Sequence, residues 1–334
     1  MKKRRWMTVV LACALVIGLL TGSAVGSAGQ DQIRLSYLEA HVGEYNAYFI
    51  RCTDSGVCPT EALDRYFGNT FYNMVLEGDF YDVSRLCTWL TRQGTVKSLA
   101  LSISPEDLTR PVNRENTDDP ETVGDTWTIR AANERVTRRD AEPIGSAEDY
   151  LKAHPVFQTE TAGAARQLLP ETMERTLTAV RTVKSLCDSR GIRLVVLCPP
   201  LYGEELARYD REELARFYTQ LAAVTPYWDF LYTPVSLDPR YFYEPGRFRP
   251  WVGQMMLARM FDDETVYVPG GFGTYVTRET AAEHWAAWDQ VTATPEKERT
   301  AQVPVLMYHH IGYEPGNGMV VTPERLKEQL SALK

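Results

Sequence analysis

Two hydroxyl side chains follow the first apolar run of the chain and could act as nucleophiles. Thr53 and Ser55 come directly after residues 46–52 (NAYFIRC), where the turn sequence Thr-Asp-Ser-Gly begins. A serine or threonine hydroxyl is a weak nucleophile unless a neighbouring base takes its proton. Acyl chemistry at this turn therefore requires a base from a distant part of the chain.

The segment at residues 244–247 (EPGR) carries charges that could take part in such a site. Glu244 is a candidate catalytic carboxylate. Arg247 cannot act as a general base, because its guanidinium stays protonated with a pKa above about 12. It could hold an anion such as a sugar acid by bidentate hydrogen bonds. Alternatively, it forms a surface ion pair with Glu244, which would contribute little stability.

Four further polar residues are candidate binding residues. Asn73 lies on a second apolar run and Asp79 just after it, near the edge at which parallel sheets bind ligands. Turn formation and helix capping are the alternative roles for these two. His309 and His310 follow an apolar run and could bind a metal. However, adjacent strand residues point to opposite faces, and a metal site needs three or four ligands.

Alternating strands and helices must position these residues. Apolar runs predict strands at residues 46–52, 70–76, 96–104 and 192–198. Apolar residues at helical spacing predict helices at residues 80–92, 171–190, 204–224, 249–261, 281–291 and 323–333. The nearly continuous apolar run Ile192–Cys198 is typical of a parallel strand covered on both faces. The sequence therefore predicts an α/β fold built on a parallel sheet.

The first thirty residues have the pattern of an export signal. Four cations at Lys2–Arg5 precede the apolar run Trp6–Leu20, and small residues follow. This pattern fits either a cleaved signal peptide or a membrane anchor at residues 6–25. In both cases the positive-inside rule places the chain from Asp31 onward outside the cytoplasmic membrane, secreted or anchored.

Shifts in composition divide the rest of the chain into three parts. Residues 31–291 form the α/β domain, with an irregular, proline-interrupted insertion at residues 105–165. Residues 292–302 (TATPEKERTAQ) are a polar linker. Residues 303–334 start a further domain with a strand at residues 303–308, and so short a segment cannot bury a core by itself. We therefore expect this domain to be truncated.

The charge balance excludes one class of partner. The chain has 44 acidic and 36 basic residues, a formal net charge of -8. Residues 1–30 contain four bases and no acid, so the remainder carries -8 - 4 = -12. Nucleic-acid binding needs lysines and arginines against phosphates. We therefore expect no nucleic-acid partner.

Five cysteines follow the N-terminal segment. An odd number in an exported chain leaves at least one thiol unpaired. Cys52 and Cys58 have five residues between them, which fits a small loop disulfide better than a zinc site, where two to four are preferred. Cys87, Cys187 and Cys198 fall in apolar segments and are expected to be small buried side chains.

Two C-terminal segments carry the more specific of two family resemblances. VPVLMYHHIG (Val303–Gly312) and VVTPERLKEQLSALK (Val320–Lys334) resemble the opening strand and first helix of polysaccharide deacetylases of the NodB-homology class. The resemblance covers about a tenth of the chain. It implies a distorted (β/α) barrel that removes N-acetyl groups from exported glycans, with a divalent metal such as zinc held by an aspartate and two histidines. Because the ligand motifs come later in that family, we expect no metal in this chain.

A second resemblance spans residues 45–290. FIRCTDSGVCPTEAL (Phe49–Leu63), IRLVVLCPP (Ile192–Pro200) and YFYEPGRFRPWVG (Tyr241–Gly253) resemble exported SGNH-hydrolase-like proteins of the D-alanyl-transfer and alginate-acetylation type. The resemblance implies a three-layer, flavodoxin-like parallel sheet. It also implies that active members present a Gly-x-Ser nucleophile turn after the first strand and a late Asp-x-x-His motif. The strand order that it implies would bring residues 51–53 and 244–247 together at the carboxyl edge of one sheet.

This chain departs from that pattern at both places. The first reads Arg-Cys-Thr at residues 51–53, and the second reads Glu-Pro-Gly-Arg at residues 244–247. None of the histidines at 41, 154 and 284 stands where a base is expected. The pattern favours a domain without catalytic activity.

The sequence therefore predicts an exported cell-envelope protein of polysaccharide modification. It joins a non-catalytic SGNH-like domain to the start of a polysaccharide deacetylase, with envelope polysaccharide or peptidoglycan as partner and the membrane contacted through the N-terminus. One alternative is an O-acyl esterase or acyltransferase that uses Thr53 or Ser55. The other is a non-enzymatic cell-wall scaffold or glycan-binding protein.

Overall fold

The computed structural model describes most of the chain, as residues 32–93, 95–112, 128–131, 145–288, 310–311 and 320–332. The chain divides into two compact units, one ending at Ala293 and one beginning at Thr294. The predicted export segment 1–30 and linker 292–302 lie outside the described residues. Within the described ranges, no helix combines the length and apolarity needed to cross a membrane.

The first unit is built on one eight-stranded sheet. In chain order its strands are β1 (Gln32–Arg34), β2 (Ala47–Arg51), β3 (Phe71–Glu77), β4 (Ser98–Ser102), β5 (Thr128–Ala131), β6 (Arg193–Cys198), β7 (Tyr227–Asp229) and β10 (Thr274–Val276). The spatial order is β1-β5-β3-β2-β4-β6-β7-β10. The five strands from β3 to β7 in this order run parallel, whereas β5, β1 and β10 pair antiparallel. The predicted α/β class with a mainly parallel sheet is thus confirmed.

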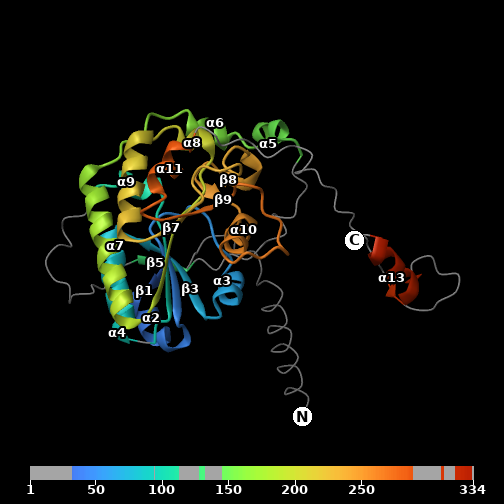
Figure 1. Cartoon of the computed structure of the whole chain (residues 1–334), viewed down its shortest axis with the longest axis horizontal. Helices are drawn as coiled ribbons and strands as arrows, with labels where there is room; N and C mark the ends of the chain where they lie inside the picture. The colour runs from blue at the N-terminus through green and yellow to red at the C-terminus, as the bar shows by residue number, and fades with distance from the viewer. Residues whose placement is uncertain are drawn as a thin grey trace, which may run out of the picture. The chain divides into compact units, whose positions relative to one another are not determined.

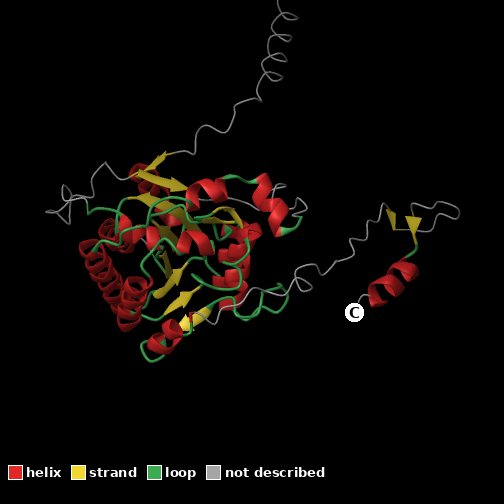
Figure 2. Cartoon of the chain, turned by 90° about the horizontal axis from the view of Figure 1, so that it is seen from above, coloured by secondary structure: helices red, strands yellow, loops and turns green. Residues whose placement is uncertain are grey.

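Helices cover both faces of the sheet (Figures 1 and 2). One face carries α4 (Phe80–Gln93), α7 (Pro170–Arg190) and α9 (Arg211–Val224), and the other carries α3 (Thr60–Phe67) and α10 (Pro250–Met260). Helix α7 ends where Gly191 adopts the left-handed conformation (φ 65°) that glycine tolerates best. The predicted helices at 80–92, 171–190 and 249–261 are confirmed, with small differences at their ends.

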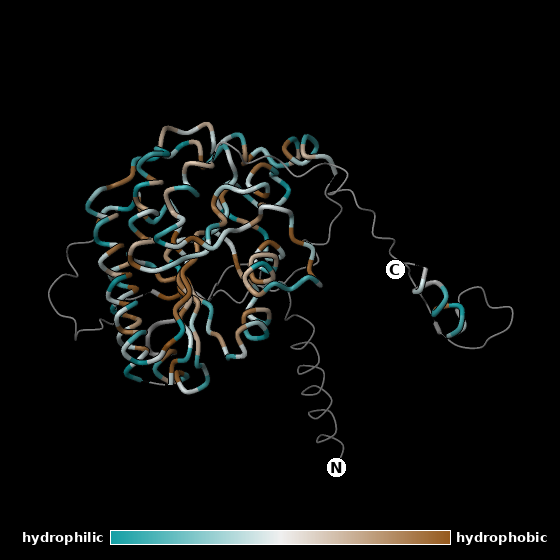
Figure 3. The backbone as a smooth tube through the Cα atoms, in the orientation of Figure 1, coloured by the Kyte–Doolittle hydropathy of each residue, from teal (hydrophilic) through white to brown (hydrophobic). Residues whose placement is uncertain are grey.

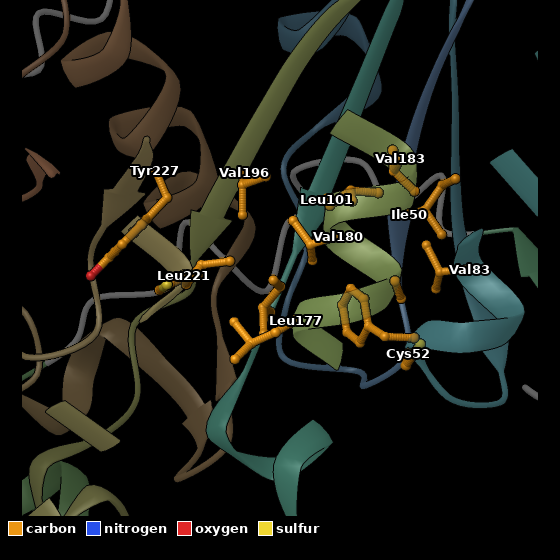
Figure 4. Close-up of a cluster of buried hydrophobic side chains, with 14 of the residues drawn as sticks. Ile50, Cys52, Val83, Leu101, Leu177, Val180, Val183, Val196, Leu221 and Tyr227 are labelled. Atoms are coloured by element: carbon orange, nitrogen blue, oxygen red, sulfur yellow. The ribbon is translucent and has the colours of Figure 1, made fainter. Parts of the chain in front are cut away.

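Two hydrophobic clusters fill the spaces between the sheet and the helices. Side chains alternate between them along each strand: Ile50 and Leu101 belong to one cluster, and Phe49 to the other. Figure 4 shows Val180 and Val183 of α7 packed in the first cluster with Ile50 and Leu101. The central strands are accordingly apolar along their length (Figure 3), as expected for parallel strands buried on both faces.

The predicted irregular insertion at 105–165 contains regular structure. It includes the 3-10 helix η2 (Pro105–Thr109), strand β5, and the helices α5 (Ala147–Ala153) and α6 (Val156–Thr161). The sequence prediction missed β5 because four residues are too few to display a period. This strand pairs with the outer edge of β3 through four antiparallel residue pairs, so the backbone groups at that edge have partners.

The predicted helix at 204–224 is two helices. α8 (Gly203–Leu206) ends early, and α9 begins after Asp210, whose side chain accepts the backbone N–H of Glu213 at 2.8 Å. This is an N-cap, which starts a new helix rather than continuing the old one. The predicted helix at 281–291 is likewise shorter: α11 comprises Ala281–Ala286, and residues 289–291 lie outside the described ranges.

The second unit contains three described elements. β11 (His310–Ile311) and β12 (Val320–Val321) pair in parallel, and α13 (Pro323–Ala332) follows. The predicted helix at 323–333 is confirmed. The strand predicted at 303–308 lies outside the described residues.

Candidate functional site

A cleft of about 630 Å³ opens at the carboxyl edge of the parallel strands. The loops after β2, β3, β4 and β6 form its walls, together with the hairpin of β8 (Phe242–Glu244) and β9 (Arg247–Phe248). At β2 the order of strands reverses, with β3 on one side and β4 on the other, and open α/β sheets bind ligands at such a point. The cleft is lined by Cys52, Asp54, Glu77, Gly78, Glu106, Arg110, Glu160, Arg166, Leu201, Glu205, Tyr209, Glu244 and Gly246.

Asn73 holds the loop that follows β2. Its amide oxygen accepts a hydrogen bond from Nη1 of the buried Arg51 at 2.9 Å, and its Nδ2 donates to the carbonyl oxygen of Cys58 at 2.9 Å. The side chain is fully buried, on the β3 residue that pairs with Phe49 of β2. The prediction that Asn73 binds a ligand is therefore not supported: both ends of its amide are used to position the loop.

Asp79 caps helix α4. Its Oδ1 accepts the backbone N–H groups of Tyr81 at 2.9 Å and Asp82 at 3.1 Å, and Nε of Arg175 lies 3.4 Å from its Oδ2. The sequence left ligand binding, turn formation and helix capping open for Asp79, and capping is the role that the structure shows.

Thr53 and Ser55 lie beneath the cleft. Both side chains are buried, at 1% and 3% exposed, and neither is among the described residues that line the cavity. Asp107, which the sequence analysis missed, is packed beside Thr53. Burial raises the pKa of Asp107 to about 7, while a hydrogen bond from the backbone N–H of Ser104 acts in the opposite direction.

The two segments that the second resemblance links meet at this cleft. The backbone N–H of Phe248 donates to the carbonyl oxygen of Ser55 at 3.0 Å. Asp54 lies between two arginines, with its Oδ1 3.9 Å from Arg51 Nη2 and 4.0 Å from Arg247 Nε. Residues 51–53 and 244–247, about 190 positions apart, therefore converge. This expectation is confirmed.

Glu244 faces an acidic neighbour across the cleft. In the hairpin of β8 and β9, the backbone of Glu244 stands opposite the backbone of Arg247. Glu160, from α6, lies near enough for the Glu244 carboxylate to raise its pKa; partial burial is the larger cause, and Glu205 adds to the effect. The cleft thus places two carboxylates where each could accept hydrogen bonds from a hydroxyl-bearing ligand.

Other carboxylates of the cleft are paired with arginines. Arg110 Nη2 lies 3.3 Å from Glu106 Oε1. Glu205, almost fully buried, receives Arg166 Nε at 3.2 Å and Arg208 Nη1 at 2.6 Å. Charge-assisted hydrogen bonds of this kind hold side chains in fixed positions. The wall of the cleft is therefore preorganised.

All five described cysteines are free thiols, and all are buried. The predicted disulfide between Cys52 and Cys58 is absent from the structure. Burial raises the pKa of the Cys58 thiol to about 12 and that of Cys187 to about 11. The expectation that Cys87, Cys187 and Cys198 are buried small side chains is confirmed.

Only one of the three domain histidines has a carboxylate partner. His41 Nδ1 and His154 Nδ1 bond to carbonyl oxygens four residues earlier, each at 2.8 Å. His284 Nε2, in contrast, lies 2.6 Å from Oδ2 of Asp229, the last residue of β7. The sequence analysis missed this pair, because the partners are 55 residues apart and belong to no local motif.

The predicted histidine pair belongs to the second unit. His310 is the first residue of β11, and His309 lies outside the described residues. Among the residues that are described, no three His, Cys, Asp or Glu side chains come together in a way that could hold a metal ion.

Comparisons of the chain with protein-family models, with curated proteins and with solved structures found no match. The fold and the cleft therefore define the protein only as an α/β protein with a polar cleft at the carboxyl edge of its parallel sheet.

Proposed function

We propose that this is an exported cell-envelope protein of polysaccharide modification, whose first domain binds a glycan in the cleft without modifying it. The observation that carries the proposal is the cleft itself: it lies at the strand-order reversal and is lined by carboxylates and arginines. No histidine is among its described lining residues. Planar charged groups of both signs suit sugar hydroxyls, which both donate and accept hydrogen bonds.

The finer fold assignment belongs to the same proposal. The parallel order β3-β2-β4-β6-β7 is that of a flavodoxin-like sheet, which supports the SGNH-like assignment. Residues 303–334 are proposed as the start of a polysaccharide deacetylase domain. Reading the gene beyond the codon for Lys334 tests this: an aspartate-pair motif and two histidines three residues apart should follow.

Binding is tested with the full chain and N-acetylglucosamine oligomers by titration calorimetry, with sedimentation on insoluble peptidoglycan as a second readout. Glu244→Gln and Glu160→Gln should each weaken binding about fivefold to tenfold, because each removes a charged hydrogen-bond acceptor. The matched control is Glu174→Gln, on the exposed surface of α7, which pairs only with Arg181 there. Equal binding by all three variants and the parent chain would place the glycan elsewhere.

The esterase alternative is tested separately. Thr53 and Ser55 are buried beneath the cleft, so the chain should hydrolyse an acetyl ester no faster than its Thr53→Ala, Ser55→Ala double variant. A clear loss of activity in the double variant would support the esterase, with Asp107 as the nearest base.

A further inference from the structure

A second, smaller pocket lies at the carboxyl end of β7. Its volume is about 140 Å³, and it is lined by Asp229, Tyr232, Thr233, Gly271, Thr274, His284, Trp285, Ala287 and Trp288. A cavity of about 150 Å³ holds one benzene molecule, so this pocket has room for one six-membered ring. None of these residues lines the larger cleft.

The Asp229–His284 pair fixes the polar part of this pocket. Asp229 Oδ1 accepts the backbone N–H of Leu231 at 3.0 Å, and Oδ2 lies 2.6 Å from His284 Nε2. Both carboxylate oxygens are thus engaged, and a carboxylate at this distance favours the tautomer of an uncharged imidazole that carries its proton on Nε2. Nδ1 is then a hydrogen-bond acceptor, on a side chain that is 22% exposed.

Thr233 supplies an unused donor in the same pocket. Its side chain is 5% exposed, and its hydroxyl oxygen has no hydrogen-bond partner in the structure. Buried polar groups in folded proteins are nearly always hydrogen-bonded. An unpartnered hydroxyl in the wall of a cavity therefore points to a ligand that completes it.

Aromatic rings form the remaining walls. Trp288 stacks on Tyr232 with ring centroids 5.1 Å apart and planes at 23°. Trp285 stacks on Tyr218 at 5.3 Å, and its indole N–H donates to the Tyr227 hydroxyl at 2.9 Å. Large flat rings beside one donor and one acceptor match a sugar ring, which has an apolar face of C–H groups and a rim of hydroxyls.

Shared lining residues relate this pocket to the larger cleft through a third cavity. Tyr232 and Trp288 also line a neighbouring cavity of about 270 Å³, and Tyr209 lines both that cavity and the cleft. Neighbouring cavities in this set of three therefore have a tyrosine in common, Tyr209 in one case and Tyr232 in the other. A chain of linked rings could occupy them in succession.

We infer that the pocket at His284 and Thr233 binds one neutral sugar residue, the end of a glycan whose other units lie in the cleft. The inference rests on the proposed glycan binding and adds to it a defined end subsite. A sugar hydroxyl fits because both Asp229 oxygens are already hydrogen-bonded, to Leu231 and to His284, which leaves the imidazole Nδ1 to accept a hydrogen bond. The sugar hydroxyls would donate to His284 Nδ1 and exchange hydrogen bonds with the Thr233 hydroxyl.

The test uses the full chain and β-1,4-linked N-acetylglucosamine oligomers of two to six units. Thr233→Val keeps the side-chain shape and removes only the hydroxyl, so folding is preserved. His284→Gln keeps an N–H donor for Asp229, but its amide oxygen does not occupy the position of the ring acceptor Nδ1. Each should weaken binding of the longest oligomer about fivefold to tenfold. The matched control is Thr178→Val, on the exposed face of α7, which should bind like the parent chain. The indole resonances of Trp285 and Trp288 should shift on binding.

Three results would overturn the inference. If Thr233→Val and His284→Gln bind like the parent chain while Glu244→Gln binds more weakly, the end subsite is wrong and the proposed glycan binding stands. If the parent chain binds no oligomer, the proposed function fails and the subsite fails with it. Indole resonances that stay unmoved on binding likewise exclude a sugar in this pocket.

Discussion

At the scale of single residues, the end of β2 is built for ion pairing. Arg51 is 1% exposed, and a buried guanidinium is tolerated only where partners replace its water. Asn73 provides one such partner at 2.9 Å and Asp54 lies 3.9 Å away. Asp54 in turn reaches Arg247. The segment that could have formed a nucleophile turn therefore forms part of a charged cluster, of which Asp54 lines the cleft.

Asp107 should make the stability of the domain depend on pH. Burial raises the pKa of its carboxyl from 3.8 to about 7, so between these values the folded chain holds a proton that the unfolded chain has lost. Stability should therefore fall as pH rises from about 4 to about 7, by up to roughly 1.4 kcal/mol per unit. Asp107→Asn, whose amide oxygen still accepts the Ser104 N–H, should remove this dependence.

The measurement is the free energy of unfolding in urea at several pH values for both proteins. The difference between them isolates Asp107, because all other groups titrate in both. The free energy of unfolding of Asp107→Asn should increase relative to that of the parent chain as pH rises through this range. A difference that stays constant from pH 4 to pH 8 would show that Asp107 is ionised at low pH in the folded chain.

The reactivity of the free cysteines can be predicted from their burial. Cys52 and Cys58 are buried and unpaired, and burial raises the pKa of both thiols, whereas alkylation requires the thiolate. Iodoacetamide should leave both unmodified in the native chain and modify both in urea without a reductant. Peptide mapping by mass spectrometry reads the result. Modification in urea that appears only after reduction would reveal a disulfide.

At the scale of elements, the long apolar segments could be predicted and the short ones could not. Ile192–Cys198 and the helix before it carry a full period of buried side chains, and both were found at nearly the right ends. β7 and β10 have three residues each, too few to show a period. They form because a neighbouring strand is already in place. Asp229 ends β7, and its partner His284 is 55 residues further along the chain, so neither a strand pattern nor a local motif could reveal the pair.

The side-chain directions around the loop after β2 could not be predicted either. Its meeting with residues 244–247 was predicted from a resemblance, but the direction of each side chain was not. The Asn73 side chain points to Arg51, and the Thr53 and Ser55 side chains are buried instead of lining the cleft. Such directions follow from register and from close packing, which a single sequence does not display.

Gly253 marks the closest approach of α10 to this loop. A Cβ atom at this position would lie 2.7 Å from the Cα atom of Cys58, so the helix or the loop would have to move. Although alanine favours helices over glycine by about 1 kcal/mol, Gly253→Ala should destabilise the chain by about 1–3 kcal/mol. Urea unfolding measures this. Gly43→Ala, where nothing lies within 4 Å, serves as the control and should change stability by less than about 0.5 kcal/mol.

At the scale of the whole molecule, the cleft and the chain have the same sign of charge. The chain after residue 30 carries -12, and the cleft is lined by six carboxylates and two arginines. A field of one sign raises the local concentration of ligands of the opposite sign. An acidic cleft that binds glycans should therefore distinguish sugars by the charge on their nitrogen.

Deacetylated glucosamine oligomers, with their amines protonated, should bind more tightly than acetylated oligomers of the same length at low salt. The preference comes from attraction between exposed charges, so it should shrink as salt rises toward about 1 M, where the Debye length falls to about 3 Å. Titration of the full chain with both oligomers across this range provides the measurement. Glu160→Gln should reduce the preference, and Glu174→Gln should leave it unchanged. A preference that salt does not alter would come from steric fit of the smaller amine, and the charge of the cleft would then have no part in selecting the glycan.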